Sequence, residues 1–74
     1  MGKPTRVTNQ IRSLRFATGE MTQAELGTRI GVTRQTVIAI EQGRYSPSLE
    51  VAFKMAQVFG VTLGEVFQYP QDRT

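Results

Sequence analysis

Apolar residues spaced three or four positions apart alternate with glycine or proline along the chain. This spacing is typical of short amphipathic helices, and glycine and proline are the residues that most often interrupt them. The pattern predicts five short helices, and therefore an all-α fold. Because no long linker separates these helices in the 74 residues, the sequence predicts one domain.

Capping residues set the expected helix bounds, because Ser, Thr and Asn favour the N-cap and Gly favours the position after a helix. The expected segments are Thr8 or Asn9 to Gly19, Thr22 to Gly31, Thr33 to Gln42, Ser48 to Gly60, and a short helix after Thr62. A glutamate three residues after Thr22 and after Thr62 predicts two reciprocal capping boxes. Gly27, inside the second helix, costs about 1 kcal/mol relative to alanine and indicates a close approach by another backbone.

One face of each expected helix carries the apolar residues that would form the core. These residues are Val7, Ile11 and Leu14; Leu26 and Ile30; Val37 and Ile40; Leu49, Ala52, Phe53, Ala56 and Phe59; and Leu63, Val66 and Phe67. Phe16 falls opposite the stripe of the first helix, so we expect a partner subunit or the chain's own tail to cover it.

The third helix has two sides of different character. Thr36, Val37 and Ile40 gather on one side, which is enough for a core. The other side carries Arg34, Gln35, Ile38 and Gln42, with Ala39 at its edge. This second side is therefore available to contact another molecule.

The composition argues against several classes of protein. The chain has no Cys and no His, so it lacks disulfides, the usual zinc ligands and the pairs used in nucleophilic catalysis. We therefore expect no enzyme, no metal and no cofactor. No apolar run approaches the roughly 20 residues that cross a bilayer, and no segment suggests a small-molecule ligand. A soluble, cytoplasmic protein is the expectation.

The net charge of +3 suits a polyanionic partner. Seven of the nine Lys and Arg residues, but three of the six Asp and Glu residues, lie in residues 1–44. The basic half of the chain is therefore the half that contains the two-sided third helix.

The second and third helices, joined by Gly31-Val32-Thr33, form a helix-turn-helix pattern. The sequence resembles the Cro/C1-type (XRE) repressor family in the stretches MTQAELG at 21–27, GVTRQTV at 31–37, IEQGR at 40–44 and SPSLE at 46–50. The likeness implies a five-helix, lambda-repressor-like DNA-binding domain over residues 9–68, with an N-terminal arm at 1–8 and a C-terminal tail at 69–74. Alanine is common in the family where this chain has Gly27.

The resemblance gives the polar side of the third helix a role in reading double-stranded DNA. Arg pairs with guanine and Gln with adenine in the major groove, whereas apolar groups contact thymine methyls. The expected base contacts are Arg34, Gln35, Ile38 and Ala39. Arg34 is equally compatible with a phosphate contact, and Ile38 with an incidental surface position.

Expected phosphate contacts surround the third helix. They are Gln23, Thr33, Thr36, Gln42, Arg44 and Tyr45. From the residues alone, Gln23 is as readily an ordinary polar helix start, and the family likeness favours the phosphate. Related repressors have a buried ion pair at the positions of Arg15 and Glu41, so we expect a structural pair there.

A closer likeness is to the small dimeric subgroup that includes the enterococcal cytolysin repressor. It implies a small antiparallel sheet between Thr5–Val7 and Phe67–Tyr69, and a homodimer interface that includes Val66, Phe67 and Tyr69. The resulting hypothesis is a homodimeric transcriptional regulator, predicted to be a repressor, that binds a palindromic operator. The alternative is a protein-binding adaptor or antitoxin with the same fold.

Overall fold

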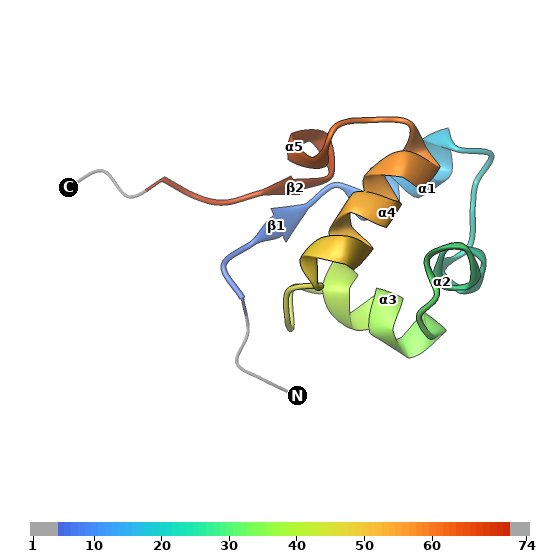
Figure 1. The fold of residues 1–74 in the computed structure, drawn as a ribbon, viewed down its shortest axis with the longest axis horizontal. Helices are drawn as coiled ribbons and strands as arrows, with labels where there is room; N and C mark the ends of the chain where they lie inside the picture. Colours follow the sequence, from blue (N-terminus) through green and yellow to red (C-terminus); the bar gives the residue numbers. More distant parts are fainter. Residues whose placement is uncertain (1–4, 72–74) are drawn as a thin grey trace.

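The computed structural model describes residues 5–71, so parts of the predicted arm (1–4) and tail (72–74) lie outside the described residues. The five predicted helices are present together with a small sheet (Figure 1). In chain order the elements are β1 Thr8–Asn9, α1 Ile11–Ala17, α2 Gln23–Ile30, α3 Arg34–Glu41, α4 Leu49–Phe59, α5 Leu63–Val66 and β2 Phe67–Gln68.

The two strands form the predicted antiparallel sheet, but β1 lies further along the chain than expected. Thr8 pairs with Gln68 and Asn9 with Phe67. The Gln10 N–H, which donates to the Val66 carbonyl at 2.9 Å, holds this register. The expectation of a strand at residues 5–7 was wrong, because the Thr5 N–H donates instead to the Gly43 carbonyl at 3.2 Å.

Pairing of Thr8 and Asn9 with β2 also displaces the start of α1. The N-cap is Gln10, which makes no side-chain cap bond, so the expected start at Thr8 or Asn9 was wrong. The Asn9 Oδ1 still accepts the Ile11 N–H at 3.1 Å. Asn9 therefore satisfies one of the free N–H groups of α1 from one position further back.

The N-caps of the other four helices are the predicted ones. Thr22, Thr33, Ser48 and Thr62 each accept the backbone N–H of the residue three positions later. Thr62 and Glu65 complete a capping box. The box predicted at Thr22 is only half formed, because the Glu25 carboxylate pairs with Arg29 at 3.2 Å.

The core lies where the five helices meet, and its largest fully buried side chains are Ile11, Leu26, Ile30, Ile40, Met55, Val37 and Val66. The expected core face of α4 was partly wrong. Leu49 and Phe53 are 67% and 49% exposed, and Met55 is buried instead. The inner face of α4 is Ala52, Met55 and Ala56, and the helix packs against α2 and α5.

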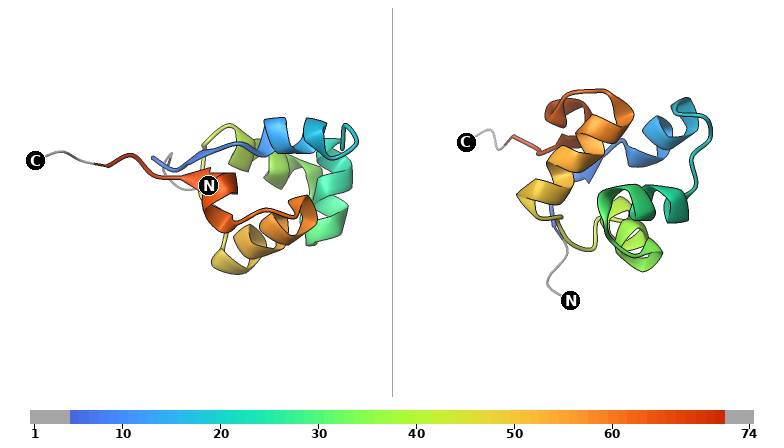
Figure 2. Two further views of the ribbon diagram at one scale, coloured as in Figure 1. Left: turned by 90° about the horizontal axis from the view of Figure 1, so that it is seen from above. Right: turned by 45° about the vertical axis from the view of Figure 1, so that its right-hand side comes forward.

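Gly27 marks the close approach between α2 and the turn that follows it. A Cβ at this position would lie 2.7 Å from the Val32 carbonyl oxygen and 3.3 Å from the Thr33 carbonyl. The predicted approach of another backbone is confirmed. It lets α2 and α3 pack side by side, at the edge of the molecule away from the C-terminal segment in the right-hand view of Figure 2.

Candidate nucleic-acid interface

The exposed side of α3 carries most of the predicted base contacts. Val37 and Ile40 point into the core, at 0% and 2% exposure. Arg34 and Gln35 are exposed in the first turn, and Ile38 is half-buried. The predicted division of α3 into a core side and an outer side is therefore present in the fold.

Ala39 is the exception among the four predicted base contacts. Ala39 is 2% exposed, so it is a core residue and the expectation of a base contact was wrong. The loop after α3 folds back against it, with the Arg44 N–H donating to the Ala39 carbonyl at 3.0 Å. A methyl group covered in this way has no surface to offer a base.

The predicted phosphate contacts lie on the segments around α3. Arg44 and Gln42 are exposed, whereas Tyr45 is half-buried and packs against the core. The hydroxyls of Thr33 and Thr36 lie 3.0 Å apart, and the Thr33 hydroxyl also caps α3. These two threonines therefore stabilise the start of the helix that carries Arg34 and Gln35.

A polar groove of about 810 Å³ lies between α1, the start of α2 and α3. Gln23 lines it from α2, and Arg34 lines it from α3. The Gln23 Nε2 donates to Glu41 Oε1 at 3.4 Å, so this predicted phosphate contact also has a partner within the chain. Arg12 also lines the groove, from α1, although no pattern in the sequence marks it as a binding residue.

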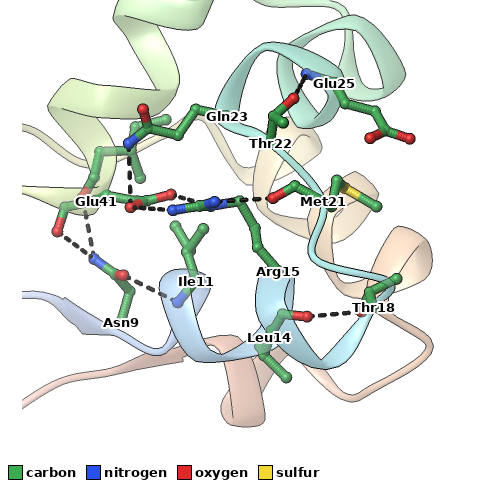
Figure 3. A network of polar contacts seen from close by, with 11 residues as sticks. Asn9, Ile11, Leu14, Arg15, Thr18, Met21, Thr22, Gln23, Glu25 and Glu41 are labelled. Carbon is green, nitrogen blue, oxygen red and sulfur yellow. Dashed lines mark hydrogen bonds and ion pairs between the residues drawn. The ribbon is translucent and has the colours of Figure 1, made fainter.

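Arg15 and Glu41 form the ion pair that the resemblance implied (Figure 3). The Arg15 Nε lies 2.6 Å from Glu41 Oε2, and its Nη2 donates to Oε1 at 3.2 Å. The Nη1 donates to the Met21 carbonyl at 2.9 Å. The two side chains are 9% and 10% exposed, so the pair joins α1 to the end of α3 with little access to water.

Asn9 also holds the C-terminal end of α3, which the sequence did not reveal. Its Nδ2 donates to the Ile40 carbonyl at 3.1 Å and to the Glu41 carbonyl at 3.3 Å (Figure 3). The last carbonyls of a helix lack partners within it. The Asn9 amide supplies a partner to the Glu41 carbonyl and a second partner to the Ile40 carbonyl, which also accepts the Gly43 N–H at 3.0 Å. An asparagine before a helix predicts only a local cap. Nothing in the sequence pattern predicts a contact between Asn9 and Ile40, which are 31 positions apart.

The predicted dimer residues differ in exposure. Val66 is 0% exposed and belongs to the core, so its assignment to an interface was wrong. Phe67 is half-buried in β2, and Tyr69 is 60% exposed. Leu49 and Phe53 add exposed apolar surface that helical periodicity alone had assigned to the core.

Phe16 is 52% exposed, so the described part of the C-terminal segment does not provide the expected cover. Two guanidinium groups lie against its ring instead. The Cζ atoms of Arg12 and Arg15 are each 5.6 Å from the ring centroid. Phe16 thus lines the groove, in contact with two arginines of its own helix.

Comparison with known proteins identifies the family. Residues 17–66, more than half of the chain, match the model described as "Helix-turn-helix". The chain belongs to the helix-turn-helix family. This finding confirms the resemblance to Cro/C1-type repressors, while membership of the small dimeric subgroup stays a prediction.

Individual relatives of this helix-turn-helix protein agree with that assignment. An uncharacterized HTH-type transcriptional regulator of Methanocaldococcus jannaschii is 52% identical over 52 residues, which cover 70% of this chain and 79% of the relative. The cryptic phage CTXphi transcriptional repressor RstR of Vibrio cholerae is 38% identical over 58 residues, covering 78% of this chain and 51% of the repressor.

A solved structure confirms the fold of the helix-turn-helix protein. A putative DNA-binding protein from Bacteroides fragilis superimposes with a TM-score of 0.74, covering 84% of this chain and 98% of that one at 19% identity. Within residues 5–71, no helix is long and apolar enough to cross a membrane. The same residues contain no group of three or more side chains suited to a metal ion.

Proposed function

We propose that the chain represses transcription by binding a palindromic operator as a homodimer, with α3 in the major groove of each half-site. The chain is a DNA-binding transcriptional regulator, as its family and the names of its relatives support. The observation that carries the proposal is the exposed side of α3, where Arg34 and Gln35 extend from a helix whose far end is held by Asn9 and Arg15. We propose no catalytic activity for the chain, and we propose that it acts in the cytoplasm.

Base recognition is assigned to the first turn of α3. A glutamine amide can pair with both N6 and N7 of adenine, and an arginine with O6 and N7 of guanine, which discriminates by about 1–3 kcal/mol per contact. We assign Gln35 to a base and Arg34 to a base or a phosphate. Ile38, beside them, provides the apolar contact to a thymine methyl or sugar.

Backbone binding is assigned to the polar residues around α3. These are Gln23, Thr33, Thr36, Gln42, Arg44 and Tyr45. Phosphate contacts fix the position of a protein on the duplex and carry no sequence information of their own. Arg44, which is exposed just after α3, supplies a full positive charge to this set.

Dimerisation would bring a second α3 to the next turn of the same DNA face, about 34 Å away. Exposed apolar side chains support this part of the proposal, because an isolated small domain gains little from leaving them in water. Tyr69 and Phe67 are the proposed interface residues, and the exposed Leu49 and Phe53 offer further apolar surface. Sedimentation equilibrium of Tyr69→Ser and of Leu49→Ser/Phe53→Ser would assign the interface.

Selection of bound DNA from a random pool, followed by gel shifts on the selected duplex, tests the function. Gln35→Ala should bind selected and unrelated duplexes more equally, whereas Arg44→Ala should weaken binding to both and flatten its salt dependence. Gln57→Ala, at an exposed position of α4, is the control. If both variants bind like the control, the assigned surface is wrong.

The exposed Leu49, Phe53 and Tyr69 also favour a second candidate, a protein-binding adaptor or antitoxin. In this case a partner protein, rather than a second copy, would cover the apolar surface. Co-purification of one stoichiometric partner, together with no salt-sensitive retention on DNA, would support this candidate over the first.

A further inference from the structure

We infer that Arg12 binds a backbone phosphate of the duplex from the wall of the polar groove opposite α3, and that Phe16 positions its guanidinium. This inference rests on the proposed function and extends its contact surface to α1. It concerns two residues of α1 that build neither the core nor the exposed side of α3.

The first observation is the pairing of Arg12 with Phe16. The two residues are four positions apart in α1, so their side chains share one face of the helix. The guanidinium carbon lies 5.6 Å from the ring centroid, within the range of an attractive cation–π contact. Contact with the Phe16 ring restricts the directions in which the Arg12 side chain can point. Because Phe16 is 52% exposed and lies outside the core, positioning Arg12 is the role that we assign to it.

The second observation is the charge of the groove. Arg12 and Arg34 line it from α1 and α3. Among the described residues that line it, Glu41 supplies the one carboxylate, and Arg15 holds that carboxylate in the buried ion pair. The groove therefore keeps an excess of positive charge and favours an anion.

The position of the groove indicates which anion it would bind. Arg34 and Gln42 belong both to the groove lining and to the segment proposed to face DNA. A duplex that receives α3 in its major groove has a sugar-phosphate strand on each side of that helix. The strand on the α1 side would pass the mouth of the groove, whose lining includes both Arg12 and Arg34. The ligand is thus a phosphodiester of double-stranded DNA.

The salt dependence of binding tests the role of Arg12. Dissociation constants of wild type, Arg12→Gln and Arg29→Gln are measured by fluorescence anisotropy between about 50 and 200 mM salt, on the selected duplex and on an unrelated one. Arg29 is the matched control, because Arg29→Gln removes the same charge from an exposed pair with Glu25 on α2, outside the groove lining.

Arg12→Gln should weaken binding to both duplexes by the same factor and lower the salt slope by about 0.9 per subunit. Between about 50 and 200 mM salt, the loss of affinity should therefore be smaller for Arg12→Gln than for wild type, by a factor of about 3.5 per subunit. Arg12→Lys should keep most of the slope, and Arg29→Gln all of it. If Arg12→Gln keeps the slope of wild type, or if Arg29→Gln loses as much, Arg12 is not the contact.

A double mutant tests the positioning role of Phe16. Phe16→Leu keeps an apolar side chain but removes the ring face, so it should weaken binding to both duplexes in the wild-type background. In the Arg12→Gln background it should have no further effect, because the guanidinium that it positions is gone. An effect that persists in that background would assign Phe16 to Arg15 or to folding and would overturn this role.

The two proposals fail in different ways. If wild type shows no salt-sensitive binding to any duplex, the proposed function fails, and the inference fails with it. If wild type binds and Gln35→Ala relaxes its specificity, but Arg12→Gln behaves as wild type, only the role of Arg12 is overturned.

Discussion

The Asn9 side-chain amide donates to the main-chain carbonyl of Glu41 at 3.3 Å, at the end of α3. Asn9 also belongs to β1, which pairs with β2. The end of the helix proposed to read DNA is therefore connected through one side chain to the small sheet. Because Arg15 holds the Glu41 carboxylate, side chain and main chain at this position are both anchored to the segment around α1.

Replacing Asn9 should reduce both stability and sequence discrimination. Asn9→Ala removes the donor to two carbonyls and the acceptor for the Ile11 N–H, at about 0.5–1.5 kcal/mol for each net bond. Asn9→Asp should keep the acceptor and lose the donor. Urea unfolding measures the stability, and gel shifts on selected and unrelated duplexes measure the discrimination. Gln57→Ala, at an exposed position of α4, is the control, and equal behaviour of the two alanine variants would contradict the role of Asn9.

Breaking the ion pair from one side should destabilise the fold more than replacing both partners. Arg15→Met or Glu41→Leu alone leaves a charge with little access to water, at a cost of about 3–5 kcal/mol. The double replacement removes both charges and should recover most of this loss. Urea unfolding of the three variants forms the test. If the double variant were as unstable as the worse single variant, the loss of stability would come from altered side-chain packing and not from an unpaired charge.

Adding a methyl group at two glycines should have opposite effects. Gly27→Ala gains helix propensity, but its Cβ would lie 2.7 Å from the Val32 carbonyl oxygen, so we expect a net loss of about 1 kcal/mol. Gly64→Ala in α5 meets nothing within 4 Å and should stabilise the protein by about 0.4–1 kcal/mol. Thermal unfolding of both variants measures the difference. If Gly27→Ala stabilised the protein as much as Gly64→Ala, the turn after α2 would be able to shift and accept the methyl group without a loss of stability.

Glu65 should make stability depend on acid pH. Hydrogen bonds from the Thr62 main-chain N–H, and then from the Thr62 hydroxyl, hold the pKa of Glu65 below its ordinary value of 4.5. The folded state therefore favours the carboxylate. Its contribution is fully present above pH 4.5 and is lost as pH falls below 4.5 through the lower folded pKa.

Thermal melts of wild type and Glu65→Gln from neutral pH to well below pH 4.5 provide the measurement. The advantage of wild type should narrow below pH 4.5, since the amide of the variant does not titrate. If the difference in melting temperature between the two proteins stayed constant over the whole pH range, Glu65 would not contribute to the pH dependence of stability.

Features that depend on neighbours along the chain could be predicted from sequence. Thr22, Thr33, Ser48 and Thr62 cap their helices through bonds to residues three positions later, so the local pattern is sufficient. Features that depend on the rotation of a helix about its own axis could not be predicted from sequence. Apolar residues lie on several sides of α4, and periodicity does not say that Met55 turns inward while Phe53 turns outward.

The candidate site divides in the same way. Arg34 and Gln35 were placed correctly on the outer side of α3, because Val37 and Ile40 determine which side is buried. Ala39 was misplaced, since a small residue at the edge of a face is covered only when a loop or another helix reaches it. Helical spacing placed Val66 correctly in the core, and only its further assignment to an interface was wrong. Asn9 acts over 31 residues, a distance at which sequence pattern carries no signal.

The pairing of β1 with β2 has a consequence for how the molecule is made. The Thr8 hydroxyl donates to the Gln68 carbonyl at 3.4 Å, and the two residues are 60 positions apart in the chain. Closing so large a loop is entropically unfavourable until the helices have already drawn its ends together. During synthesis, the first strand emerges from the ribosome long before its partner exists. The helices are therefore expected to assemble first, and the sheet to close as a late step of folding.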